Sequence, residues 1–168
     1  MIRACDCNDL EQIYTIINDG AVAYKGVIPE DCWAEPYMSG NELRHSLNAG
    51  VHFWGFDENG ALSGVMGLQE VQDVTLIRHA YVLTSRQRQG IGAALLHHLQ
   101  GLAATPVLIG TWADAHWAIR FYQRNGFRLV GESHGRPLMK RYWTISSRQM
   151  DVSVVLADKK WHELNVLL

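Results

Sequence analysis

Three features of the sequence predict a single α/β domain. Short apolar runs bounded by turn residues alternate with stretches in which apolar residues recur every three or four positions, so strands alternate with helices. The 168 residues suit one domain, and no repeat or low-complexity linker divides them. A hairpin turn joins two of the apolar runs. The predicted order is strand, two helices, three strands, helix, strand, helix, strand and, after a long connection, a last strand.

The first third of the chain predicts two helices. Asn8 followed by Glu11 has the spacing of a capping box, which begins a helix. The apolar face of this helix comprises Leu10, Ile13, Tyr14, Ile17 and Ala21. Ser39 followed by Glu42 is a second capping box and begins the next helix. Residues 24–37 between them are irregular, because one glycine and two prolines interrupt the pattern.

Apolar runs between turn residues are the predicted strands. They are residues 2–5, 51–56, 61–68, 75–83, 106–111, 127–130 and 152–156. Asn59 and Gly60 form the strongest short signal for a β-hairpin. A second turn at Gln72 and Asp73 leads into the next strand. Pro106 lies at the first position of its strand, where a missing N–H group is tolerated.

A basic loop with two glycines, residues 86–93, joins a predicted strand to a predicted helix. The start of a helix has about four unpaired N–H groups and the positive end of the helix dipole. Gly90 and Gly92 lack a Cβ atom, so a ligand can approach the backbone closely. The spacing fits neither a P-loop nor the dinucleotide-binding fingerprint. Because Arg86 and Arg88 add positive charge, the loop predicts a ligand with a pyrophosphate; a tight strand–helix turn is the alternative.

A further predicted helix ends in residues 118–127, Ala-Ile-Arg-Phe-Tyr-Gln-Arg-Asn-Gly-Phe. Asp114 is its predicted N-cap. Its apolar stripe comprises Trp117, Ala118, Phe121 and Tyr122. Gly126 suits the left-handed position just past the last turn, and Phe127 begins a strand. Taken alone, Tyr122 is an ordinary tyrosine of an amphipathic helix.

Composition argues against several classes of function. The formal net charge is −2 at pH 7, so we expect no nucleic-acid partner. No apolar run approaches about 18 residues, so we expect no membrane span. The first residues lack the apolar region of a signal peptide, so we expect a cytoplasmic protein. Cys5, Cys7 and Cys32 lack the spacing of a zinc site, so we expect reduced thiols and no metal.

The spacing Gln87-x-x-Gly90-x-Gly92 resembles the acyl-CoA pyrophosphate motif of the GCN5-related N-acetyltransferase (GNAT) superfamily. Residues 118–127 resemble the second signature of this superfamily, in the expected order. The resemblance implies a central mixed, mostly antiparallel sheet of about six to seven strands, splayed at the cofactor cleft and flanked by about four helices.

The same resemblance implies how residues 1–168 are organised as one N-acetyltransferase domain. Residues 75–127 are then the acyl-CoA-binding core. Residues 1–50 and 131–168 are then the acceptor side.

The implied activity is acetyl-CoA-dependent transfer of an acetyl group to a primary amine by direct attack of the amine. The acceptor is a small molecule, a peptide or a protein, and Tyr122 is the general acid for the departing thiolate. Residues expected to contact acetyl-CoA lie on the strand, in the loop and at the start of the helix: Tyr81, Val82, Leu83, Gln87, Arg88, Gln89, Gly90, Ile91, Gly92 and Ala93. The alternatives are a non-catalytic acyl-CoA-binding or sensor module and an interaction domain without CoA affinity.

The general base is open at this level, because residues 75–81 contain no carboxylate. Glu70 and His79 are candidates, and a base acting through water is equally suitable. Each also has an ordinary structural interpretation. Glu70 is then a solvated charge near a turn, and His79 a hydrogen-bonded core residue.

The predicted acceptor-binding residues are Trp33, Tyr37 and Arg78, although core packing of the aromatic residues is an alternative. Arg78 suits an anionic group of the substrate or an acidic partner. The sequence does not identify the acceptor amine. The apolar tail, residues 161–168, raises the hypothesis of a homodimer through the last strand or the tail.

Overall fold

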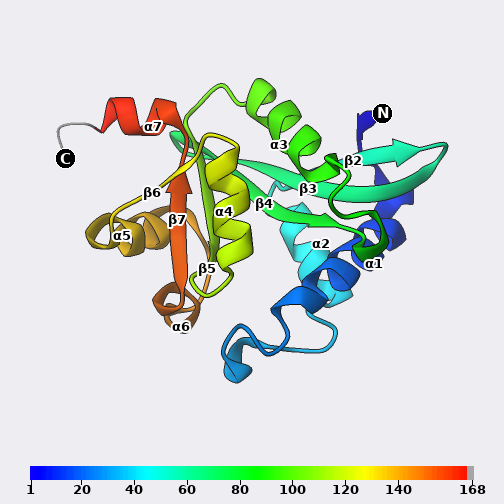
Figure 1. The fold of residues 1–168 in the computed structure, drawn as a ribbon, viewed down its shortest axis with the longest axis horizontal. Helices are drawn as coiled ribbons and strands as arrows, with labels where there is room; N and C mark the ends of the chain where they lie inside the picture. The colour runs from blue at the N-terminus through cyan, green and yellow to red at the C-terminus, as the bar shows by residue number, and fades with distance from the viewer. Residues whose placement is uncertain (166–168) are drawn as a thin grey trace. The chain divides into compact units, whose positions relative to one another are not determined.

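This computed structural model describes residues 1–165 and contains one sheet with the strand order β1-β2-β3-β4-β5-β7-β6 (Figure 1). The strands are β1 (Ile2–Ala4), β2 (His52–Glu58), β3 (Ala61–Val71), β4 (Val74–Val82), β5 (Val107–Trp112), β6 (Arg128–Leu129) and β7 (Ser153–Ala157). β1 pairs with β2, β2 with β3, β5 with β7 and β6 with β7, in each case antiparallel. The seven-stranded, mostly antiparallel sheet confirms the predicted fold class.

Helices connect and follow these strands. They are α1 (Leu10–Ala21), α2 (Gly40–Asn48), α3 (Ile91–Leu102), α4 (His116–Arg124), α5 (Glu132–Tyr142), α6 (Ser147–Asp151) and α7 (Lys159–Leu164). The first four are the predicted helices. The last three occupy the stretch that the sequence presents as a long connection and a tail. α5 forms although Pro137 lies inside it, and its Met139 and Tyr142 are buried in an apolar core.

The chain divides into two compact units. Unit 1 comprises Met1–Gln69 and Ile77–Leu102, and unit 2 comprises Glu70–Leu76 and the described residues from Ala103. The boundary therefore passes through both β3 and β4. In unit 2, α5 packs with β5 and β7, and its buried core includes Val74, Leu76, Leu108, Val155 and Ala157.

In unit 1, α1 and α2 cover one face of β2 and β3, and α3 covers the other (Figure 1). The core on the first face includes Ile13, Ile16, Ile17, Leu43, Phe53 and Val65. On the other face, a Cβ atom at Gly64 would lie 2.8 Å from Ile91 Cγ2 and 3.2 Å from Val82 Cγ2. Glycine at this position therefore lets the first turn of α3 pack directly on β3.

Gly64→Ala should lower the free energy of unfolding by about 1–3 kcal/mol, because an added methyl group overpacks this contact. Denaturant titration measures the change. Gly101→Ala, on α3, is the control, since a Cβ atom there meets nothing within 4 Å. That change should raise stability by up to about 1 kcal/mol through helix propensity. An equally stable Gly64→Ala protein would contradict the close packing of α3 on β3.

The two predicted capping boxes have different outcomes. The box at α2 is confirmed, because Glu42 N donates to Ser39 Oγ and Ser39 N donates to Glu42 Oε2. The predicted box of Asn8 and Glu11 is wrong. The observed box joins Asp6 and Asp9 and begins a 3-10 turn, Cys7–Asp9, that leads into α1.

Asp9 serves in this box because a second contact holds it in place. Its carboxylate accepts hydrogen bonds from Arg3 Nη1 at 2.7 Å and Arg3 Nη2 at 2.8 Å, and Arg3 Nε also donates to Asp57. Charge-assisted, bidentate hydrogen bonds of this kind are about twice as strong as neutral ones. The ion pair thus draws the start of the helical segment toward β1.

The predicted turns are confirmed. Asn59 and Gly60 have φ angles of 59° and 90°, as a type I′ hairpin requires, and Gly60 N donates to Asp57 Oδ1 at 2.7 Å. Gln72 begins the second turn with a φ angle of 53°. No helix among residues 1–165 is long and apolar enough to cross a membrane.

Helix α4 differs from the prediction at its start and agrees with it at its end. Asp114 is not the N-cap of α4: the N-cap is Ala115, and Asp114 supplies only its carbonyl oxygen, to His116 N at 2.9 Å. The predicted C-terminal glycine is confirmed, since Gly126 has a φ angle of 91°. Of the apolar tail, residues 161–164 belong to α7, and residues 166–168 lie outside the described residues.

Candidate functional site

The loop before α3 combines a left-handed backbone with an exposed surface. Arg88 and Gly90 have φ angles of 61° and 82°, and a Cβ atom at Gly90 would meet nothing within 4 Å. α3 begins directly afterwards at Ile91, and Gly90 O accepts from Ala94 N at 2.9 Å. The N–H groups of the first helical turn therefore stand beside open space, which suits an anionic ligand.

Contacts within unit 1 anchor this loop at its start. Leu83 N donates to Ser63 O at 2.9 Å, and Thr84 donates to Asp19 through its backbone N at 2.6 Å and its hydroxyl at 3.1 Å. Arg86 Nη2 forms an ion pair with Glu58. The loop is thus held by β3, α1 and the hairpin before the exposed residues begin.

The two arginines of the loop have different surroundings, which the sequence does not distinguish. Arg86 is half-buried and paired with Glu58, so its charge serves the fold of the loop. Arg88 is exposed and has no hydrogen-bond or ion-pair partner among residues 1–165. Arg88 is therefore the loop cation available to a ligand.

The end of β4, at Tyr81 and Val82, and the following Leu83 are half-buried. Glycine in α1 allows this strand to approach, because a Cβ atom at Gly20 would lie 3.1 Å from Tyr81 Cδ1 and 3.2 Å from Val82 O. The other predicted acyl-CoA contacts, Gln87, Gln89, Ile91, Gly92 and Ala93, follow in the loop and the first turn of α3. All ten predicted acyl-CoA contacts therefore lie in unit 1, within the segment of residues 81–93.

The structure brings Trp33 and Tyr37 together, with ring centroids 5.6 Å apart. Tyr24 adds a third ring, 5.7 Å from Tyr37, and Tyr81 lies 6.3 Å from both Tyr24 and Tyr37. We call these four half-buried residues the aromatic cluster. The sequence places Tyr24 on the acceptor side and Tyr81 among the acyl-CoA contacts, and their proximity to Trp33 and Tyr37 depends on long-range folding.

His79 has a strained backbone in the middle of β4. Its φ angle is 51°, which is uncommon for a residue other than glycine and is often found at functional sites. Its ring stacks on Phe53 at a centroid distance of 5.8 Å, and Nε2 lies 3.1 Å from Ser46 Oγ. Burial, and to a smaller degree the charge of Arg78, lowers the pKa of His79 to about 3. His79 is therefore neutral at physiological pH and a weak base.

The low pKa of His79 predicts a specific pH dependence of stability. The unfolded chain binds a proton near pH 6.5, whereas the folded chain does so only near pH 3, so stability falls as the pH drops through this window. Between pH 7.5 and 5, the wild-type protein should lose about 2 kcal/mol more than His79→Asn. Denaturant titrations at each pH measure this difference. If the wild-type protein and His79→Asn lost the same free energy of unfolding between pH 7.5 and 5, His79 would not be buried in its neutral form.

The remaining predicted site residues lie on different elements. Glu70 is an exposed residue of β3 in unit 2. Arg78 is a half-buried residue of β4 in unit 1, and its Nη1 donates to Gln69 Oε1 at 2.8 Å. Tyr122 is a buried residue of α4 in unit 2, 8% exposed, and its ring contacts those of Phe121 and Phe127.

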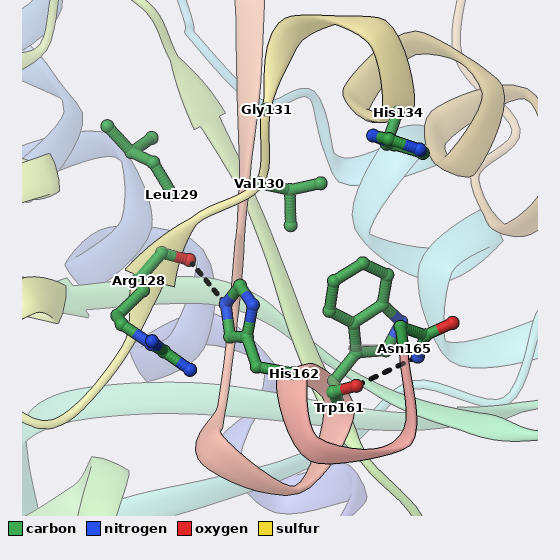
Figure 2. A pocket seen from close by; sticks show the side chains of 8 residues that line it. All are labelled: Arg128, Leu129, Val130, Gly131, His134, Trp161, His162 and Asn165. Atoms are coloured by element: carbon green, nitrogen blue, oxygen red, sulfur yellow. Dashed lines mark hydrogen bonds between the residues drawn. The ribbon is translucent and has the colours of Figure 1, made fainter. Parts of the chain in front are cut away.

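A pocket of about 370 Å³ lies within unit 2 and shares no residue with the predicted site (Figure 2). It is lined by Arg128, Leu129, Val130, Gly131, His134, Trp161, His162 and Asn165. Two of its polar contacts are internal, since His162 Nε2 lies 3.3 Å from Arg128 O and Asn165 Nδ2 donates to Trp161 O. The described residues contain no group of three or more His, Cys, Asp or Glu side chains that could hold a metal ion.

Comparison with known proteins agrees with the resemblance seen in the two motifs. The family model for the acetyltransferase (GNAT) domain matches residues 49–129. This range includes the loop and Tyr122. No curated protein sequence matches the chain.

Solved structures share the fold across nearly the whole chain. PaiA N-acetyltransferase from Thermoplasma acidophilum, in complex with coenzyme A, is 17% identical, with a TM-score of 0.70 over 95% of this chain and 98% of that one. Ribosomal-protein-S18-alanine N-acetyltransferase from Escherichia coli is 18% identical, with a TM-score of 0.65 over 94% and 92%. An aminoglycoside 6′-N-acetyltransferase with coenzyme A is 14% identical, with a TM-score of 0.64 over 94% and 96%.

Proposed function

We propose that the chain is an acetyl-CoA-dependent N-acetyltransferase, because the GNAT domain model matches residues 49–129 and solved N-acetyltransferases share its fold. The acetyl group passes to a primary amine of a small molecule, a peptide or a protein. The observation that carries the proposal is the exposed loop of 87–90 that leads into the first turn of α3, within the matched range. Two structurally similar proteins were solved with coenzyme A, and two are named for acceptors with amines.

The residues of the loop fit a pyrophosphate. Open space at Gly90, the N–H groups at the start of α3 and the unpaired guanidinium of Arg88 supply donors and positive charge at one place. A hydrogen bond to a charged group contributes about 1.5–3 kcal/mol, so several of them account for micromolar affinity. In this proposal residues 75–127 are the acyl-CoA-binding core, and residues 1–50 and 131–168 the acceptor side.

Acetyl-CoA, when bound, supplies a thioester whose carbonyl carbon an amine can attack. The chain then has two tasks in proton transfer. Tyr122 is proposed as the general acid that protonates the departing thiolate, since a phenol carries its proton at neutral pH and can donate it. A general base must accept a proton from the ammonium form of the acceptor. Glu70, His79 and a water-relayed group remain the candidates, and the low pKa of His79 makes it the weakest of them.

The test is a calorimetric titration of the protein with acetyl-CoA, followed by an assay of thiol release with a panel of amines. Micromolar binding with amine-dependent thiol release is the expected result. Absence of binding at millimolar acetyl-CoA would overturn the proposal.

A non-catalytic acyl-CoA-binding module is the second candidate, because β4 has no carboxylate between Thr75 and Tyr81 and His79 is a weak base. This function predicts acetyl-CoA binding without thiol release from any amine. The proposed homodimer is a separate hypothesis. Equilibrium sedimentation showing a monomer at micromolar concentration would remove it.

A further inference from the structure

We propose that the acceptor is an amino carboxylic acid and that Arg78 binds its carboxylate. This inference rests on the proposed acetyltransferase function and narrows its acceptor. It begins from a half-buried cation in unit 1 that the fold leaves without a counter-ion.

Three arginines of residues 1–165 are half-buried, namely Arg3, Arg78 and Arg86. Arg3 pairs with Asp9 and Asp57, and Arg86 pairs with Glu58. No carboxylate oxygen of the described residues lies within 4.0 Å of the Arg78 guanidinium. Burial lowers the pKa of Arg78, because partial removal from water destabilises its charged form. An anion from outside the chain would stabilise that charged form.

The side chain of Arg78 is held in position by hydrogen bonds through an uncharged residue, Gln69. Gln69 is only 9% exposed, and its Nε2 donates to Ala49 O at 2.8 Å, just after α2. This bond directs Gln69 Oε1 toward Arg78, where it accepts from Nη1 at 2.8 Å. One side of the guanidinium is thereby fixed by a neutral acceptor, and the positive charge is not neutralised.

The other side of the guanidinium is available. Nε and Nη2 of Arg78 have no partner among residues 1–165, and they are not among the buried nitrogen atoms without a partner, which are Arg86 Nε and His98 Nε2. These two atoms of Arg78 are therefore not fully buried. An arginine presents Nε and Nη2 as a planar fork that matches the two oxygens of a carboxylate.

The surroundings of this fork suit a small acceptor. His79 follows Arg78 in β4 and is neutral, so it adds no second cation. Ser46 on α2 and Gln69 are uncharged, and the aromatic cluster begins three residues along the strand at Tyr81. Arg78 also precedes the proposed acyl-CoA contacts on the same strand. A carboxylate held at Arg78 would therefore place the rest of a small acceptor along β4, beside apolar side chains.

The experiment compares free amino acids with their carboxamides as acceptors, in an assay of thiol release from acetyl-CoA. We expect turnover of at least one amino acid and a kcat/KM about a hundredfold lower for its carboxamide, because two charge-assisted hydrogen bonds are lost. Arg78→Gln should raise KM for the amino acid by a similar factor and abolish the preference over the carboxamide. Its Kd for acetyl-CoA should not change.

Gln69→Glu keeps an acceptor for Arg78 Nη1 and supplies a carboxylate from within the protein, but it loses the hydrogen bond from Gln69 Nε2 to Ala49 O. It should increase KM for the amino acid at least tenfold and leave the Kd for acetyl-CoA unchanged. A purely structural role for Arg78 predicts the opposite pattern, with a lower Tm for Arg78→Gln and an unchanged KM.

The outcomes separate this inference from the function on which it rests. Turnover confined to amines without a carboxylate, or equal turnover of acid and carboxamide, would overturn the inference and leave the acetyltransferase function intact. Binding of acetyl-CoA with no turnover of any amino acid would also overturn it. Absence of acetyl-CoA binding would overturn the proposed function itself.

Discussion

Gly92→Glu should weaken acetyl-CoA binding at least a hundredfold. Gly92 lies in the first turn of α3, one residue after Ile91, where the helix begins. A glutamate there places a negative charge beside the N–H groups proposed to bind the pyrophosphate. It repels the phosphates and occupies the donors that they need. Each charge-assisted hydrogen bond lost costs about 1.5–3 kcal/mol, and about 1.4 kcal/mol corresponds to a tenfold change in Kd. Isothermal titration calorimetry measures the effect directly.

Gly101→Glu is the matched control for this substitution. It adds the same charge to the same helix, one residue before the last, and a Cβ atom there meets nothing within 4 Å. The Kd for acetyl-CoA should remain within about twofold of the wild-type value, since the added charge is about nine residues, or 13 Å, along the helix from Gly92. If Gly92→Glu binds acetyl-CoA as tightly as Gly101→Glu, the loop is only a strand–helix turn.

Local signals in the sequence predict most of the fold, because their physical cause lies within a few residues. Ser39 and Glu42 satisfy each other's backbone partners whatever packs around them. Asn59 and Gly60 adopt the left-handed conformations that their side chains permit. Such elements can be predicted from spacing alone.

The capping box predicted at the start of α1 is wrong because a residue outside the local pattern, Arg3, determines which side chains form the cap. Asp9 is drawn into the cap by Arg3, which is itself held by Asp57 across the first strand pair. No pattern within 8–11 contains that information. The same reason applies to α5, which packs into the core of unit 2 despite its internal proline.

The candidate site divides in the same way. The acyl-CoA segment is continuous in sequence, so its motif could be found directly. The distinction between Arg86 and Arg88 could not, because Arg86 pairs with Glu58, 28 residues away. The missing counter-ion of Arg78 and the grouping of the aromatic cluster likewise depend on contacts between distant segments. Residue type suggested a role for Arg78, and only its surroundings show which nitrogen atoms are available.

Tyr122→Phe should lower kcat by about a hundredfold to ten-thousandfold, the range typical of losing a general acid. The phenyl ring can keep the edge-to-face contacts that Tyr122 makes with Phe121 and Phe127, at centroid distances of 5.1 and 6.2 Å. The substitution therefore removes the hydroxyl group and preserves the packing of α4. Acetyl-CoA binding should be retained, because the proposed pyrophosphate contacts are in the loop of 87–93.

Tyr142→Phe provides the control, since it also removes the hydroxyl of a buried tyrosine in unit 2. The Tyr142 hydroxyl donates to Asp73 Oδ1 at 2.8 Å, so its loss should lower the free energy of unfolding without changing kcat. Stopped assays of thiol release and denaturant titrations of both variants separate the two effects. Full activity in Tyr122→Phe would assign proton donation to another group. Loss of turnover with unchanged acetyl-CoA affinity would distinguish an enzyme from a binding module, because a module has no turnover that this hydroxyl could support.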